Sequence, residues 1–172
     1  GCCMREEVGA VGAKLLYEDD TVQHAGVVVG FGGYAGHVNT GIGRDDYGYM
    51  VRAVINCNYS AVTAACMMTR KSLFLEAGGF DEQFVVACND VDYCLQLGKM
   101  NKLIVYNAYA EWYHYESKSR GYEDTPEKLA RFESEVNKFQ KKWPEILEKG
   151  DPYYNPNFPV TQAPFTLGEK TK

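Results

Sequence analysis

Val8-Gly9-Ala10-Val11-Gly12-Ala13-Lys14-Leu15-Leu16 is a strand-like run of small and apolar residues near the start of the chain. The acidic segment Glu18-Asp19-Asp20 then predicts a turn. The apolar residues within 21–29 predict a returning strand, so the region is expected to form a β-hairpin. Residues 1–7 read as the last turns of a helix that leads into the run.

The middle of the chain alternates irregular and regular segments. Glycines at positions 30, 32, 33, 36, 41, 43 and 48 predict a long mobile loop, which lacks the G-x-x-x-x-G-K-[ST] spacing of a phosphate-binding loop. Residues 58–69 are small and β-branched, as in a buried strand. A short helix over 71–77 should end at Gly78-Gly79, because glycine readily adopts the left-handed conformation found at helix ends.

The second half predicts two helices with short strands between them. Asn89 is expected to cap a helix that runs to about Gly98, followed by strands over 103–106 and 110–115. Thr125-Pro126 opens a second helix, which ends or restarts at Pro144. Its apolar stripe has helical spacing and consists of Leu129, Phe132, Val136, Phe139 and Trp143. The Pro-rich and Asn-rich segment after Asp151 should be extended.

The composition excludes several classes of protein. The 172 residues carry 18 Lys and Arg against 23 Asp and Glu, a net charge of −5. No basic stripe is present, so no nucleic-acid partner is expected. The sequence shows neither a membrane-length apolar run nor a secretory signal, so we expect a soluble, cytoplasmic protein. Six cysteines without a C-x-x-C pair are expected to be buried thiols rather than disulfides or zinc ligands.

A first chemical cluster is Cys88-Asn89-Asp90-Val91-Asp92, at the start of the first predicted helix. A carboxylate at a helix N-terminus stays ionised, so it can accept a proton or hold a cation. Simple helix capping explains the same residues. Because Asp90 and Asp92 are two positions apart, they point away from each other and should not act as one pair.

A second cluster runs from His114 to Gly121 and contains Lys118 and Arg120. Two cations beside a glycine suit a loop that binds an oligoanion such as a diphosphate. The imidazole of His114 can ligate a divalent metal. The alternative interpretation is that these are ordinary charged surface residues.

Seven segments, in this order, resemble a known family. They are Val8 to Tyr17, Gln23-His24-Ala25-Gly26, Val62-Thr63-Ala64-Ala65-Cys66, Gly78-Gly79-Phe80-Asp81-Glu82, Asn89-Asp90-Val91-Asp92-Tyr93-Cys94-Leu95, His114 to Gly121 and Asp151-Pro152-Tyr153-Tyr154-Asn155-Pro156-Asn157. Over residues 8–158 the sequence resembles the C-terminal half of bacterial family 2 glycosyltransferases, the GT-A type that builds cell-surface polysaccharides.

The resemblance implies inverting transfer of a sugar from a nucleotide-diphosphate sugar to a saccharide acceptor hydroxyl. It gives Asp90 the role of catalytic base and Asp92 that of a supporting or acceptor-orienting carboxylate. His114 would help hold a divalent metal, Mg or Mn, on the donor diphosphate. Lys118 and Arg120 would bind the diphosphate leaving group. The segment that borders the acceptor pocket would comprise Gly79, Phe80 and Asp81, with Trp112 as an apolar wall.

The same resemblance predicts an α/β fold that is an incomplete GT-A domain, with a small mixed sheet, flanking helices and no N-terminal nucleotide-binding half. Residues 1–158 would be the acceptor-side part of the catalytic domain, and 159–172 an extended polar tail. The metal is expected only together with the missing half, which would carry the Asp-x-Asp motif, so the isolated chain should be inactive. An exposed sheet edge predicts a homodimer, and the full-length parent is expected to act at a membrane surface.

Two alternatives remain open from the sequence. One is a non-catalytic carbohydrate-binding module, which the 13 tyrosines suit because amphipathic rings line sites for sugars. The other is a metal-dependent hydrolase, which would require Asp90, Asp92 and His114 to converge on one metal.

Overall fold

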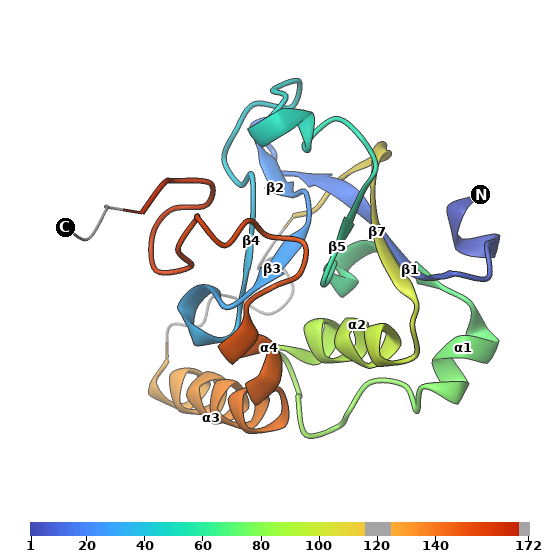
Figure 1. Ribbon diagram of the computed structural model, residues 1–172, viewed down its shortest axis with the longest axis vertical. Coiled ribbons are helices and arrows are strands. Elements are labelled where there is room, and N and C mark those ends of the chain that lie inside the picture. The colour runs from blue at the N-terminus through green and yellow to red at the C-terminus, as the bar shows by residue number, and fades with distance from the viewer. Residues whose placement is uncertain (116–124, 169–172) are drawn as a thin grey trace.

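A long central strand organises the computed structural model, which describes residues 1–115 and 125–168. The strands are β1 (Val8–Leu16), β2 (Val22–His24), β3 (Val27–Val29), β4 (Ala35–His37), β5 (Cys57–Tyr59), β6 (Met67–Thr69) and β7 (Leu103–Tyr113). The helices are α1 (Lys71–Glu76), α2 (Asn89–Lys99), α3 (Pro126–Lys142) and α4 (Pro144–Lys149). The fold is therefore mixed α/β, with α3 and α4 next to α2 and the small second sheet (Figure 1).

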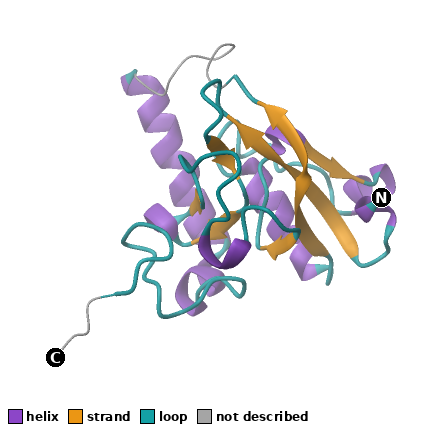
Figure 2. Cartoon of the chain, turned by 90° about the horizontal axis from the view of Figure 1, so that it is seen from above, coloured by secondary structure: helices purple, strands orange, loops and turns teal. Residues whose placement is uncertain are grey.

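The main sheet is built around β1. This strand pairs in parallel with β7 and in antiparallel with β2 and β6, while β5 pairs in antiparallel with β7. β3 and β4 form a separate two-stranded antiparallel sheet. Seen from above, the main sheet is twisted and helices flank it (Figure 2). The predicted mixed sheet with flanking helices is confirmed at this level.

Glycine lets β1 lie directly against the chain that crosses it. A Cβ added at Gly12 would lie 2.5 Å from Cβ of Val62, which is inside van der Waals contact. Val62 is itself fully buried. Close packing against Val62 therefore requires glycine at position 12 of β1.

The predicted hairpin is correct only in its first half. β2 returns along β1, but the chain then turns at Gly26, where φ is +109°, and β3 enters the second sheet. The ring of Tyr59 fills the space where a side chain at this glycine would sit. The region predicted as a loop over 30–48 also contains β4, which pairs with β3 in antiparallel orientation. The glycines in this region therefore do not exclude a short strand.

Three other predictions about secondary structure need correction. Residues 58–69 are not one strand but β5, a 3₁₀ turn (Ala64–Cys66) and β6. Residues 1–7 hold only a 3₁₀ turn, Cys2–Met4. The two predicted strands within 103–115 are one strand, β7, whose register to β1 shifts between Asn107 and Glu111. A bulge therefore absorbs the residues that were predicted to form a break.

The helices lie where they were predicted, but Asn89 is the first residue of α2 rather than its cap: Cys88 occupies the capping position, and the Asn89 side chain accepts the adjacent N–H of Asp90 at 2.7 Å. Thr125 caps α3 by accepting the backbone N–H of Lys128, and Pro144 starts α4 after a break at Trp143. Of the predicted stripe, Phe139 and Trp143 are buried, whereas Leu129 is 48% exposed. The stripe therefore packs mainly through its C-terminal half.

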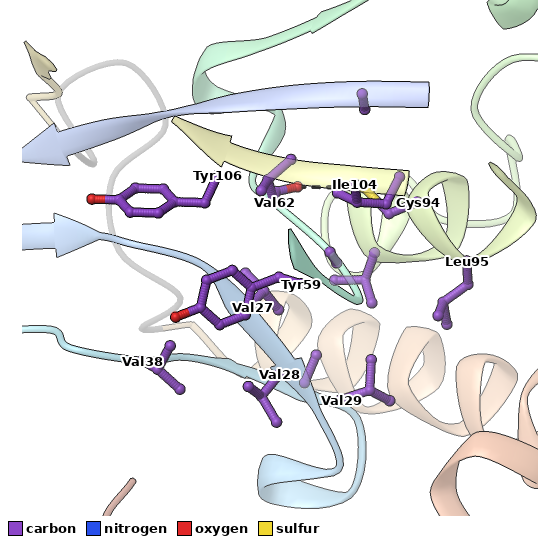
Figure 3. Close-up of a cluster of buried hydrophobic side chains, with 14 of the residues drawn as sticks. Val27, Val28, Val29, Val38, Tyr59, Val62, Cys94, Leu95, Ile104 and Tyr106 are labelled. Atoms are coloured by element: carbon purple, nitrogen blue, oxygen red, sulfur yellow. Dashed lines mark hydrogen bonds between the residues drawn. The ribbon is translucent and has the colours of Figure 1, made fainter. Parts of the chain in front are cut away.

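One buried cluster joins the two sheets and α2. Figure 3 shows the valines of β3 facing Tyr59, Val62, Ile104 and Tyr106 across the core. Cys94 of α2 lies beside Val62 and donates its thiol hydrogen to the carbonyl of that residue at 3.7 Å. The six cysteines are free, but only Cys3, Cys88 and Cys94 are buried, so the prediction of buried thiols is correct for three of them. In the described part of the chain, no helix has the length and apolar character needed to cross a membrane.

The end of the chain differs from the extended polar tail predicted over 159–172. Over its described part, to residue 168, this segment folds back on the protein. The ring of Phe165 stacks on Tyr49 with centroids 4.7 Å apart, and its backbone N–H donates to the hydroxyl of Tyr154 at 2.8 Å. Apolar side chains spaced among the polar ones therefore anchor the segment.

Candidate functional site

Asp90 lies in the first turn of α2, with a half-buried side chain. Its Oδ2 accepts the backbone N–H of Ala64 at 3.0 Å, and its Oδ1 accepts that of Val91 at 2.8 Å. A carboxylate offers about four lone-pair positions, so about two remain for a hydroxyl proton. The carboxylate is thus oriented by backbone groups from two segments while it keeps capacity to accept a proton.

Asp92 is 0% exposed and belongs to a different environment. Its Oδ1 accepts the indole N–H of Trp143 at 2.7 Å and pairs with Nζ of Lys142 at 2.8 Å. Gln96 donates to its Oδ2 at 2.5 Å. The two aspartates are therefore separated, as their spacing predicted, and Asp92 has no exposed surface through which it could contact an acceptor.

The segment 79–81 is linked to Asp92 through Lys142. Nζ of Lys142 lies 2.7 Å from Oδ2 of Asp81, so one ammonium bridges two carboxylates. This hydrogen bond is the main reason that the pKa of Asp81 falls to about 2, with Gln83 adding to the effect. Burial alone would lower the pKa of Lys142, but its bonds to Asp81 and Asp92 outweigh burial and raise it. Lys142 therefore stays charged and ties α3 to α2.

Phe80 and Gly79 complete that segment. Gly79 has φ of +74°, and the Phe80 ring packs on Phe74 and Tyr93 while remaining 40% exposed. The positive φ explains the glycine, because a side chain would be strained in that conformation. An exposed aromatic ring near the start of α2 can contact an apolar sugar face.

Glu135 of α3 is a buried carboxylate that the sequence analysis did not single out. It is 1% exposed and accepts the backbone N–H groups of Val85, Val86 and Ala87. A signal was present, because Glu135 falls between Phe132 and Phe139 on the apolar stripe of the helix. A charged residue at such a position must have a partner inside the protein.

His114 follows the carboxyl end of β7, and Gln23 fixes its ring. Nε2 of Gln23 donates to the carbonyl of His114 at 3.4 Å, so Oε1 of Gln23 accepts from Nδ1 of the ring at 2.8 Å. With its hydrogen on Nδ1, the neutral ring has a lone pair on Nε2. Such a second hydrogen bond is the usual way that proteins orient a metal-binding imidazole.

Charged residues surround the end of the sheet beside His114. Lys14 of β1 is buried, pairs with Glu111 at 3.1 Å and donates to the carbonyl of Arg44. Arg44 pairs with the same carboxylate at 2.7 Å. Burial alone would raise the pKa of Glu111, but the bonds from Arg44 and Lys14 outweigh it and lower the pKa. These contacts fasten the 38–48 segment to β7 just after its bulge.

Trp112, the predicted apolar wall, is 63% exposed near the carboxyl end of β7. Lys118 and Arg120, predicted to bind the diphosphate, lie outside the described residues. Among the described residues, no hydrogen bond or ion pair joins Asp90 to His114, and each side chain has its own partners.

The described residues do not bring together the ligands that a hydrolase of the kind considered would need. Among them, no group of three or more His, Cys, Asp or Glu side chains could hold a metal ion. Asp92 is committed to Lys142 and Trp143, away from solvent. The hydrolase alternative therefore loses the convergence of Asp90, Asp92 and His114 on which it depended.

A groove of ≈ 1330 Å³ lies elsewhere on the molecule. It runs between the C-terminal half of α2, α4 and residues 151–160, and neither Asp90 nor His114 lines it. The hollow is therefore separate from the two residues that carry the chemical interpretation.

Known proteins are similar to this chain over almost its whole length. A protein named O-antigen biosynthesis protein RfbC, from Myxococcus xanthus, is 39% identical over 166 residues, covering 91% of this chain and 12% of that protein. An uncharacterized protein, y4gI, from Sinorhizobium fredii is 45% identical over 164 residues, covering 95% of this chain and 18% of that protein. No family model and no solved structure matches the chain.

A shorter match carries a more specific name. An N-acetylglucosaminyl-diphospho-decaprenol L-rhamnosyltransferase of Mycobacterium tuberculosis is 38% identical over 60 residues, which is 35% of this chain and 20% of that protein. The matches define the chain as a glycosyltransferase-like segment. This similarity supports the family 2 type that the seven sequence segments resemble. The chain spans less than a fifth of the length of the two relatives that cover most of it.

Proposed function

We propose that this chain is the acceptor-side part of a GT-A glycosyltransferase domain that transfers a sugar, with inversion, from a nucleotide-diphosphate sugar to a saccharide hydroxyl in polysaccharide biosynthesis. The observation that carries the proposal is the carboxylate of Asp90, oriented by the N–H groups of Ala64 and Val91 at the start of α2. The name of the Myxococcus relative supports a part in O-antigen biosynthesis, and that of the Mycobacterium relative supports sugar transfer.

Asp90 would act as the general base. The acceptor hydroxyl gives its proton to the carboxylate while its oxygen forms a bond to the anomeric carbon of the donor. The nucleotide diphosphate leaves from the opposite face with the electron pair of the broken bond. A fixed carboxylate lowers the barrier by both positioning and proton transfer. No second carboxylic acid is needed, because a nucleotide diphosphate leaves without protonation.

His114 would serve the leaving-group side. Its Nε2 lone pair could supply one ligand to Mg or Mn, and such a cation would neutralise charge on the diphosphate. The described residues contain no group of three or more His, Cys, Asp or Glu side chains that could hold a metal ion, so further ligands would come from diphosphate oxygens and from the rest of a longer parent. Lys118 and Arg120 would add positive charge. On this proposal the isolated chain binds donor weakly and turns over negligibly.

The other assigned residues would shape the acceptor side. Asp92 and Asp81 would support Asp90 through Lys142, which pairs with both of them. Phe80, with Gly79 beside it, and the exposed ring of Trp112 would contact the acceptor sugar. The parent would work in the cytoplasm at the membrane surface.

Replacing the proposed base tests the function. In a parent-length protein that carries this segment, Asp90→Asn should lower sugar transfer about 100-fold or more, since loss of a general base typically costs that much. Donor binding should be unchanged. The measurement is transfer of radiolabelled sugar alongside calorimetric titration of the donor.

Asp45→Asn is the matched control, because Asp45 is an exposed carboxylate in a loop. It should leave both transfer and donor binding unchanged. Full transfer activity in Asp90→Asn would overturn the proposal.

A carbohydrate-binding module remains the second candidate, since Tyr109 and Trp112 expose aromatic rings on β7. That function predicts saccharide binding by this chain without nucleotide or metal, lost in Trp112→Ala. Such binding, together with transfer that does not depend on Asp90, would favour the module over the transferase.

A further inference from the structure

Glu135 makes an unusual set of contacts for a side chain in the middle of a helix. Its Oε1 accepts the backbone N–H groups of Val85 at 2.9 Å and Val86 at 3.3 Å, and its Oε2 accepts that of Ala87 at 2.7 Å. Within the described chain, no backbone carbonyl accepts from these three amides. The local path of the loop before α2 is therefore set by one carboxylate from α3.

The residue that follows these amides has a strained backbone. Cys88 has φ of +65°, a left-handed conformation that is unfavourable for a residue with a side chain. Such a conformation persists only where its surroundings hold it in place. Burial, with the charges of Asp90 and Glu135 next, raises the pKa of the Cys88 thiol to about 12, so the thiol stays neutral. Cys88 is thus a structural turn residue, two positions before Asp90.

The same loop is attached to α3 at further points. Nζ of Lys138 donates to the carbonyl of Gln83 at 3.3 Å, and Lys142 pairs with Asp81. After the turn at Cys88, the carboxylate of Asp90 accepts the backbone N–H of Ala64 at 3.0 Å. A displacement of about 1 Å at the turn would exceed the range of that hydrogen bond.

We infer that Glu135 is a positioning residue for Asp90: by binding three consecutive amides it holds the turn at Cys88, and the turn aims the carboxylate of Asp90 at the acceptor. The inference rests on the proposed function for its catalytic meaning, since Glu135 is buried and does not itself touch a substrate. Its structural part, the coupling from Glu135 to Asp90, can be measured independently of any transfer reaction.

The variant Glu135→Gln isolates this role. The glutamine keeps the volume, but its neutral oxygen is a weaker acceptor and its amide nitrogen faces an N–H group. In this chain, hydrogen exchange followed by nuclear magnetic resonance should become about tenfold faster or more at the amides of 85–87. It should also become faster at the amide of Ala64, for which the described residues provide no acceptor besides Asp90. Glu133→Gln, at an exposed position of the same helix, should change neither.

The amide of Ala64 decides between positioning and simple loop support. If the amides of 85–87 exchange faster while Ala64 is unchanged, Glu135 supports the loop without positioning Asp90, and the inference is overturned. If Glu135→Gln does not fold, Glu135→Asp retains the charge on a shorter side chain and is judged by the same two sets of amides.

A kinetic measurement on a parent-length transferase completes the test. Glu135→Gln should lower kcat about tenfold at unchanged KM for the donor, because the base is displaced while the donor site is intact. Unchanged kcat, in an enzyme that Asp90→Asn inactivates, would contradict the inference alone. An enzyme that keeps its activity in Asp90→Asn would contradict the proposed function. The exchange rate at Ala64 would still test the structural coupling between Glu135 and Asp90, independently of that outcome.

Discussion

His24 is fully buried beside a second imidazole. Its Nδ1 lies 3.1 Å from Nδ1 of His37, and its Nε2 is buried with no hydrogen-bond partner among the described residues. Burial, and next the charge that His37 can carry, lower the pKa of His24 well below its usual range. His24 is thus held neutral in the folded protein.

This arrangement predicts a loss of stability in mild acid. At a pH below about 6.5 the unfolded chain protonates His24 while the folded chain does not, so the free energy of unfolding falls as pH decreases. The slope from this one group is at most about 1.4 kcal/mol per pH unit. Urea unfolding between pH 5.5 and 8 should show it, and His24→Phe should flatten the curve. An unchanged slope in His24→Phe would assign the effect to other groups.

The candidate residues differ in how far the sequence could predict them. Asp90 and His114 were singled out as candidates because each stands in a short motif whose residue types suit the chemistry, and their roles stay predictions from the family resemblance. The burial of Asp92 depends on Trp143 and Lys142, about fifty positions away, which no local pattern reveals. Gln23 stood in a recognised motif, but its role in fixing the His114 ring required the pairing of β1 with β2 and β7.

At the scale of elements, the close approach of Val62 to Gly12 of β1 can be tested with a single substitution. Gly12→Ala should lower the free energy of unfolding by about 1–3 kcal/mol, because the new methyl group meets Val62 at 2.5 Å. Urea denaturation measures the change. In Gly12→Ala/Val62→Ala the total loss should be smaller than the sum of the single losses, because the two sites share one space.

Gly98 of α2 provides the control, since a Cβ there meets nothing within 4 Å. Gly98→Ala should raise the free energy of unfolding by about 0.5–1 kcal/mol through helix propensity. A Gly12→Ala protein as stable as the wild type would show that β1 can move away from Val62.

Helices were predicted better than strand connections, for a physical reason. A helix such as α3 is specified by its own spacing, cap and prolines, all of which are local. The departure of β3 from the hairpin depends on the Tyr59 ring against Gly26, and the continuity of β7 depends on a bulge opposite β1. Both are decided by residues far away in the sequence.

At the scale of the whole molecule, β6 is an edge strand of the main sheet: within the described chain it pairs with β1 and with no other strand. The strand has three residues, and Met68 in its centre is 65% exposed. An apolar edge of this kind favours pairing with another strand. We propose that two copies of the isolated chain associate through it, as the sequence analysis expected.

Sedimentation at increasing protein concentration tests this association. The wild-type chain should become heavier with concentration, and Met68→Lys should suppress the effect, because a charge on an edge strand opposes pairing. Met50→Lys changes a methionine of similar exposure away from that edge and should have no effect. A wild-type chain that remains monomeric at every concentration would contradict the proposal.

The carboxylate of Glu135 also has a consequence for synthesis. It lies 48 positions after Ala87, the last amide that it binds. A ribosome therefore releases the loop before α2 well before it releases the side chain that shapes that loop. Until residue 135 emerges, the nascent turn at Cys88 has no partner for its amides, so Asp90 acquires its orientation only after the polypeptide has been extended through α3.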